Sequence, residues 1–158
     1  MPADFFIDSP RNMVFSKAAG QLSHADVLDH MDRLQNHPAF LPAFNQLLDF
    51  RQVTSVTLSS RQVAELAKRT IFGPTSRRAF AVSADWQFGL ARMFGAYREI
   101  QGETGIVVFR EIKECLDWLS LSSEPDHGLF VNLRPAEQVV PDGTLSRTPD
   151  RTARRFKS

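Results

Sequence analysis

Short apolar runs recur along the chain, and the segments between most of them carry apolar residues at helical spacing. The runs of strand length are Phe5 to Ile7, Met13 to Phe15, Gln46 to Phe50, Ala79 to Val82 and Ile106 to Phe109. The first two flank a Ser-Pro-Arg-Asn turn, which predicts an N-terminal hairpin. The last is rich in β-branched residues, and we therefore expect it to be buried on both faces.

Two helices are predicted before the Ala79 to Val82 run. The first spans roughly Ser23 to Asn36, because Ser23 and Asp26 form a capping-box pattern and Pro38 prevents continuation. The second begins near Ser60, because Ser59 and Gln62 form another capping-box pattern. It keeps its apolar spacing as far as Ile71, just before a Gly-Pro pair. Both helices then follow a strand, as in a layered α/β protein.

Two more helices are predicted in the second half. Asp85 can cap a third helix whose apolar stripe is unusually wide, and Trp86, Leu90, Phe94 and Tyr97 are the stripe residues that we consider for a ligand or partner face. A fourth helix carries Ile112, Cys115, Leu116 and Leu119 on one face. The fold class we expect is α/β, with a mostly parallel sheet that is entered through the hairpin and flanked by helices.

The expected domain covers residues 1–120, and residues 121–158 form a C-terminal extension. Within the extension, residues 128–133 could add one strand or a packed arm, and a basic, poorly ordered tail starts at residue 144. From that position on, five basic residues stand against one acidic residue. The overall charge is only +1, so the rest of the chain is slightly acidic, which is unlike a nucleic-acid-binding domain. We expect no specific nucleic acid, and at most a peripheral membrane contact through the tail.

Composition indicates one folded domain. The 158 residues are 42% hydrophobic and 23% charged, close to globular averages. No apolar run is long enough to span a membrane and no signal peptide is evident, so a cytoplasmic location is the expectation. The single Cys115 fits a reducing compartment and excludes a thiolate metal cluster.

Signatures of catalysis are missing from the sequence. It contains neither a glycine-rich phosphate loop nor a Gly-x-Ser-x-Gly nucleophile elbow. His24 and His30 are six residues apart and therefore on different faces of a helix, so we expect them to be solvated or bonded within loops, not to bind a metal. Arg77 and Arg78 are candidates for contact with an anion, although a loop arginine pair is usually solvated. We expect no enzyme, no metal and no cofactor.

Several strings, in this order, resemble the bacterial SpoIIAA-like or STAS-like domains. They are Gly20-Gln21-Leu22-Ser23, residues 37–42, Gln46-Leu47-Leu48-Asp49-Phe50, Arg78-Ala79, residues 88–94, Val108-Phe109-Arg110 and Trp118-Leu119. The resemblance covers residues 4 to about 120 and implies a sheet flanked by helices. In the anti-sigma-factor antagonists of this family, a serine at a helix start is phosphorylated to control partner binding.

The matching helix start here is Thr57-Leu58-Ser59-Ser60-Arg61, which makes Ser59 and Ser60 the candidate phosphoacceptors. The Asp-Ser-x-Gly string of those relatives is absent at this point. The alternative is that Ser59 only caps the helix.

Two function classes remain open. In the first, the protein is a regulatory module without enzymatic activity, which docks onto a protein partner or onto a second copy as a homodimer. In the second, it carries an apolar ligand or lipid, because STAS-like domains of this group are similar to lipid-binding CRAL-TRIO domains and the apolar third helix could line a pocket.

Overall fold

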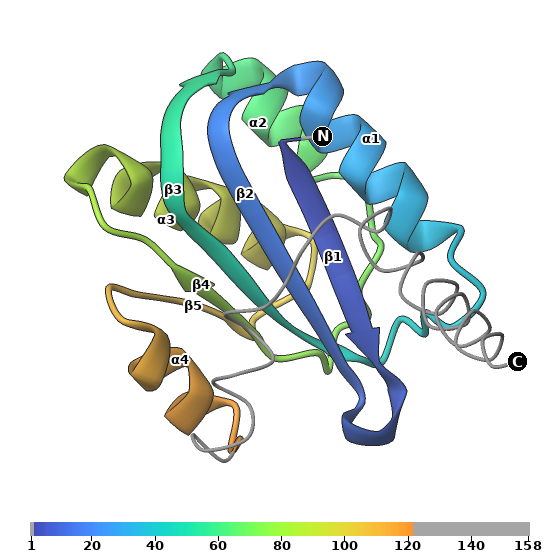
Figure 1. Ribbon diagram of the computed structural model, residues 1–158. Coiled ribbons are helices and arrows are strands. Elements are labelled where there is room, and N and C mark those ends of the chain that lie inside the picture. The colour runs from blue at the N-terminus through green and yellow to red at the C-terminus, as the bar shows by residue number, and fades with distance from the viewer. Residues whose placement is uncertain (1, 122–158) are drawn as a thin grey trace, which may run out of the picture.

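A computed structural model describes residues 2–121 (Figure 1). The predicted strand or arm at 128–133 and the basic tail from residue 144 lie outside the described residues. The strands are β1 (Ala3–Asp8), β2 (Met13–Ser23), β3 (Asn45–Thr57), β4 (Arg78–Ala81) and β5 (Ile106–Phe109). The α-helices are α1 (His24–Gln35), α2 (Ser60–Leu66), α3 (Asp85–Ile100) and α4 (Ile112–Trp118). A 3-10 turn, η1 (Ser9–Arg11), joins β1 to β2.

The five strands form one sheet in the order β1-β2-β3-β4-β5, so each strand lies beside its neighbour in sequence. β1 pairs antiparallel with β2, and the other three pairings are parallel. The predicted hairpin and the predicted mostly parallel sheet are therefore confirmed. None of the helices in residues 2–121 is long and apolar enough to cross a membrane.

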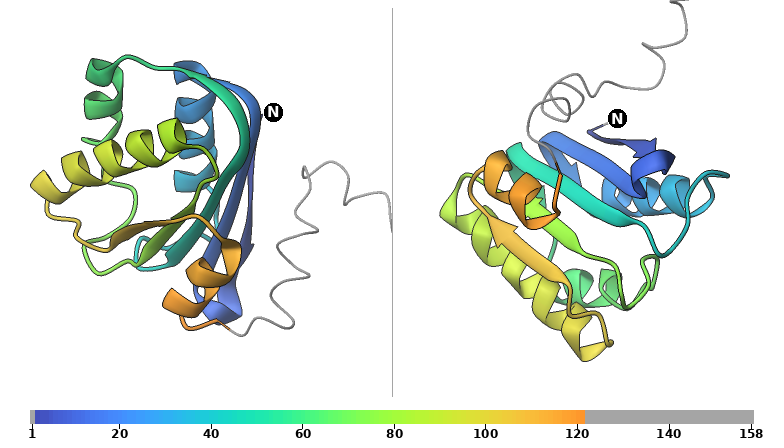
Figure 2. Two further views of the ribbon diagram at one scale, coloured as in Figure 1. Left: turned by 90° about the vertical axis from the view of Figure 1, so that its left-hand side faces the viewer. Right: turned by 90° about the horizontal axis from the view of Figure 1, so that it is seen from below.

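Helices cover both faces of the sheet (Figure 2). The three helices that connect parallel strands, α1, α2 and α3, lie on one face, as crossovers of one handedness require when the strand order runs in one direction. Helix α4 packs on the opposite face, where Ile112, Cys115 and Leu116 meet Phe15 and Leu47.

Side chains alternate between the two faces along the strands. Phe15, Leu47 and Ala79 point toward α4, whereas Leu48 and Phe80 point toward the other three helices. The α4 face is mainly apolar, although the carboxylate of Asp49 is buried in it. The opposite face also carries polar side chains, and these define the candidate site described below.

Both predicted capping boxes are present. Ser23 Oγ accepts from the backbone N–H of Asp26 at 3.2 Å, and the Asp26 carboxylate accepts from the Ser23 backbone N–H at 2.8 Å. The second box joins Ser59 and Gln62 in the same reciprocal way. These local signals determine where α1 and α2 begin.

Three expectations about individual elements are wrong. β5 is the last strand of the sheet, and its residues are only partly buried. The expectation of burial on both faces failed because a β-branched run does not reveal whether its strand is central or at an edge. Helix α2 ends at Leu66, although apolar spacing continues to Ile71. Asp85 is the first residue of α3 and not its cap; the side chain of Gln87 accepts from the backbone N–H of Ala84 instead.

Candidate functional site

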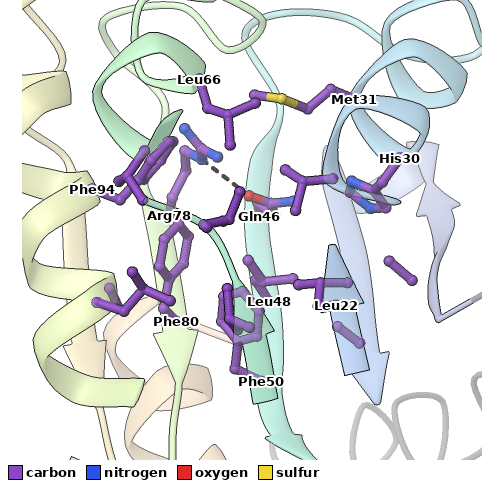
Figure 3. A pocket seen from close by; sticks show the side chains of 18 residues that line it. Leu22, His30, Met31, Gln46, Leu48, Phe50, Leu66, Arg78, Phe80 and Phe94 are labelled. Carbon is purple, nitrogen blue, oxygen red and sulfur yellow. Dashed lines mark hydrogen bonds between the residues drawn. The ribbon is translucent and has the colours of Figure 1, made fainter. Parts of the chain in front are cut away.

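A cavity lies between the sheet and the three helices α1, α2 and α3 (Figure 3). It encloses about 120 Å³ and is partly open to solvent. Most of the 18 side chains that line it are apolar. Three are polar, namely His30, Gln46 and Arg78, and β3 and β4 place the last two side by side because these residues pair in register.

The polar side chains form a continuous hydrogen-bonded chain across the sheet. His30 Nε2 lies 3.2 Å from Ser16 Oγ, which accepts from Gln46 Nε2 at 3.0 Å. Arg78 Nε donates to Gln46 Oε1 at 3.0 Å, the bond drawn in Figure 3. Ser16, Gln46 and Arg78 are all buried. The network satisfies groups that would otherwise be costly to bury.

Beyond Arg78 the network ends in a buried ionic cluster. Arg78 Nη1 lies 3.1 Å from Glu103 Oε1, and Arg98 Nε donates to the same oxygen at 2.7 Å. Arg98 also donates to the carbonyl oxygen of Ala67 at 2.7 Å. The side chain of Glu103 is 1% exposed, so two guanidinium groups share one enclosed carboxylate.

The turn that follows α3 places Glu103 in this cluster. Gly102 has a φ of +98°, which glycine adopts without strain, and it lets the chain turn back at the helix end. The backbone N–H of Glu103 then bonds to the carbonyl of Arg98 at 3.0 Å, and that of Gly102 bonds to Glu99 at 3.0 Å. This is the Schellman pattern, and it places Glu103 beside Arg98.

Gly105 allows the next strand to approach. A Cβ atom at this position would lie 2.3 Å from the carbonyl oxygen of Ser76, so no larger residue fits without a shift of the backbone. The backbone N–H of Arg78 bonds to the Gly105 carbonyl at 2.7 Å. The absence of a side chain at Gly105 thus allows β4 and β5 to pair next to Arg78.

His30 closes the other end of the polar chain as a neutral ring. Burial and, to a smaller extent, the nearby Arg33 guanidinium lower its pKa to about 4, while the Asp4 carboxylate opposes the shift. The ring also packs edge-to-face against Phe5 at 5.6 Å between centroids. At neutral pH the cationic charge in the cavity wall therefore comes from Arg78 and not from His30.

Comparison with known proteins bears on the fold. No family model matches the chain, and no curated protein matches it. A solved structure does: a protein of the DUF3478 family from Shewanella loihica PV-4, described as having a SpoIIAA-like fold. The two structures align with a TM-score of 0.52 and 18% sequence identity, over 74% of this chain and 93% of the other. The chain has a SpoIIAA-like fold. The resemblance inferred from the sequence is confirmed at that level.

Within the SpoIIAA-like fold, the predicted ligand or partner face on α3 is divided between two environments. Leu90 and Phe94 line the cavity. Trp86 is 43% exposed and lies outside the cavity lining, as does Tyr97. The structure thus brings together only two of the four residues singled out for this face.

The two arginines singled out as anion contacts lie on opposite faces of the sheet, and neither is a freely solvated loop residue. Arg78 is buried and pairs with Glu103. Arg77 stacks on Trp118 of α4, with its guanidinium carbon 4.3 Å from the ring centroid, and donates to the Trp118 carbonyl. The expectation of a solvated pair is wrong. β4 begins at Arg78, so the two side chains point to opposite faces of the sheet and pack against the helices there.

The serines at the start of α2 are exposed. Ser59 Oγ accepts from the backbone N–H of Gln62 at 3.1 Å, so Ser59 caps the helix as one reading of the sequence predicts. Phosphorylation of Ser59 or Ser60 stays a prediction.

Sequence reasoning missed four polar members of the network: Ser16, Gln46, Arg98 and Glu103. It also assigned His30 to solvent or a loop, whereas the ring lines the cavity. The available signal was a polar residue directly beside an apolar run in each of two strands, Ser16 after Phe15 and Gln46 before Leu47. A buried strand that keeps a polar residue needs a partner for it, but the partner comes from a distant part of the chain.

Within residues 2–121, no cluster of three or more His, Cys, Asp or Glu side chains could hold a metal ion. Cys115 is buried on the α4 face, and burial raises the pKa of its thiol to about 12. A thiol with so high a pKa is a poor nucleophile.

A second hollow of about 540 Å³ lies between α3 and the edge strand β5. Backbone atoms of Gly89 and Gly95 and exposed side chains such as Arg92 and Glu99 contribute to its walls. It has a more polar lining and lacks the apolar enclosure of the first cavity, so the first cavity is the stronger candidate site.

Proposed function

We propose that this protein binds a small, largely apolar ligand in the cavity between the sheet and helices α1, α2 and α3. The observation that supports this function is an unfilled, apolar space of about 120 Å³ inside the domain, with polar groups gathered on part of its wall. Ligand sites in proteins combine an apolar lining with a few placed polar groups in this manner. Well-packed interiors rarely retain a space of this size.

The size of the cavity limits the ligand. An engineered, purely apolar cavity of about 150 Å³ in another protein takes up benzene. A cavity of about 120 Å³ with an opening to solvent therefore accommodates a short alkyl chain or a small ring, and a longer chain would extend through the opening.

Filling the cavity tests this function. Ala91 lies on α3, is buried and lines the cavity, and Ala96 is exposed on the same helix. We expect Ala91→Leu to abolish binding of short alkyl ligands and Ala96→Leu to leave it unchanged. Binding is measured by NMR titration of the labelled protein, and native mass spectrometry of freshly purified protein shows whether a ligand is retained. Equal binding by both variants, each with an unchanged melting temperature, would contradict a ligand site in this cavity.

A regulatory role through a protein partner is the second candidate. Its support is the accessibility of Ser59 and Ser60 at the helix start that matches the phosphorylated site of the anti-sigma-factor antagonists. Phosphate there would add negative charge near the exposed Arg61. A screen for phosphorylated peptides covering residues 57–61 after incubation with bacterial kinases tests it, with Ser59→Ala and Ser60→Ala as controls. Absence of phosphate from both serines would remove this candidate.

A further inference from the structure

The strongest unexplained feature of the cavity wall is the guanidinium group of Arg78. It is a charged group placed in an apolar lining, and its side chain is 9% exposed. Three phenylalanine rings surround it, with Phe72 closest at 4.4 Å from the guanidinium carbon to the ring centroid, followed by Phe80 and Phe94. The ring faces attract the cation, but removing it from water is still costly unless its donors and its charge are matched.

The donors of Arg78 are only partly matched. Nε donates to Gln46 and Nη1 to Glu103. Among the residues that the structure describes, no acceptor bonds to Nη2. Two N–H groups of a buried, cavity-lining guanidinium are thus available to a ligand.

The charge is also only partly matched. Arg78 and Arg98 share the single carboxylate of Glu103, so the enclosed cluster carries one net positive charge. Glu103 lies closer to Arg98, at 2.7 Å, than to Arg78, at 3.1 Å. Arg98 also donates to the carbonyl oxygen of Ala67, whereas Arg78 is the member of the cluster that lines the cavity. A ligand in the cavity can therefore reach the positive charge of the cluster through Arg78.

We propose that the cavity binds a monocarboxylate with a short apolar chain, whose carboxylate pairs with Nη2 of Arg78 and whose chain occupies the apolar space beside Leu48 and Phe80. This inference rests on the proposed function and makes it specific. One negative charge balances the cluster, and a planar carboxylate matches the fork of a guanidinium. The apolar walls next to Arg78 lower the local dielectric constant and so strengthen the pairing.

The first test uses the unmodified protein and three ligands with the same chain: hexanoate, 1-hexanol and hexylamine. Titrations followed by NMR report the dissociation constant, and shifts of the Arg78 Nε–H and Gln46 side-chain amide signals locate the ligand. We expect hexanoate to bind at least about tenfold more tightly than hexanol, as a charge-assisted hydrogen bond provides, and hexylamine to bind most weakly.

The second test compares two neighbouring arginines. Arg78→Gln removes the cation from the cavity and leaves Glu103 paired with Arg98, so the buried cluster becomes neutral. Arg77→Gln is the matched control, because Arg77 stacks on Trp118 on the opposite face of the sheet. We expect Arg78→Gln to abolish the preference for hexanoate over hexanol, and Arg77→Gln to preserve it. Arg78→Lys, which keeps the charge but not the fork, should restore part of the preference.

The outcomes separate the two proposals. Equal binding of hexanoate and hexanol by the unmodified protein, with loss of both in Ala91→Leu, would overturn the carboxylate assignment and leave the apolar site standing. Failure of all three ligands to bind would overturn both. The comparison of the three ligands uses the unmodified protein. It can therefore refute the inference even if Arg78→Gln does not fold.

Discussion

His30, Ser16, Gln46 and Arg78 form a polar line through an otherwise apolar layer, and each residue depends on the next for a hydrogen-bond partner. The line makes one part of the cavity wall polar, whereas the rest of the lining is apolar. Its members come from α1, β2, β3 and β4, so no short stretch of sequence contains it. At the scale of single residues the site is therefore a product of tertiary structure.

Acid should weaken the fold through His30. Its pKa is about 4 in the folded chain against 6.5 in the unfolded chain, so the unfolded chain takes up a proton first as the pH falls. The free energy of unfolding is therefore unaffected by His30 above pH 6.5, and it falls by up to about 3 kcal/mol as the pH drops from 6.5 to 4. Urea unfolding across this range should show a shallower decline for His30→Gln than for the parent protein. His24→Gln, which removes a histidine outside the cavity, is the control.

Removing the carboxylate of Glu103 should be strongly destabilising. Glu103→Gln leaves the buried guanidinium groups of Arg78 and Arg98 without a counter-charge, at an expected cost of about 3 to 5 kcal/mol. Glu99→Gln makes the same chemical change at an exposed position near the end of α3. Chemical denaturation measures both variants, and equal stability of the two would show that the cluster contributes little to folding.

At the scale of elements, local signals in the sequence predict most of the fold. The hairpin, the two serine caps and the apolar spacing of α1 and α4 are short-range features, and each is found where it was expected. The errors concern long-range properties. Burial of β5 depends on its place in the sheet, and the end of α2 depends on how Ile71 and Phe72 turn inward to join the core.

The cap of α2 provides a prediction at this scale. Ser59→Ala should lower the free energy of unfolding by about 1 kcal/mol, because the N–H of Gln62 loses its acceptor. Ser59→Asp can still accept from that N–H and should retain the stability of the parent. Thermal unfolding compares the two with Ser60→Ala as the control. A loss of stability in Ser59→Asp as large as in Ser59→Ala would contradict the cap as its source.

At the scale of the whole molecule, an occupied cavity should stabilise the native state. A ligand that binds only the folded chain adds about 2.7 kcal/mol when its free concentration is about 100 times its dissociation constant. The melting temperature should therefore rise with hexanoate concentration in the parent protein. Ala91→Leu should show no rise, and a rise of equal size in both would indicate a general effect of the additive.

The strand order has a consequence for the order of assembly. Every strand after the first pairs with the one that precedes it in sequence, so the sheet can grow by one strand at a time from the hairpin onward. During synthesis, the hairpin, α1 and β3 can associate once Thr57, the last residue of β3, is available. Arg78, α3 and Glu103 emerge later. The nascent chain thus acquires a partial sheet with His30, Ser16 and Gln46 in place before the cation that completes the cavity is made.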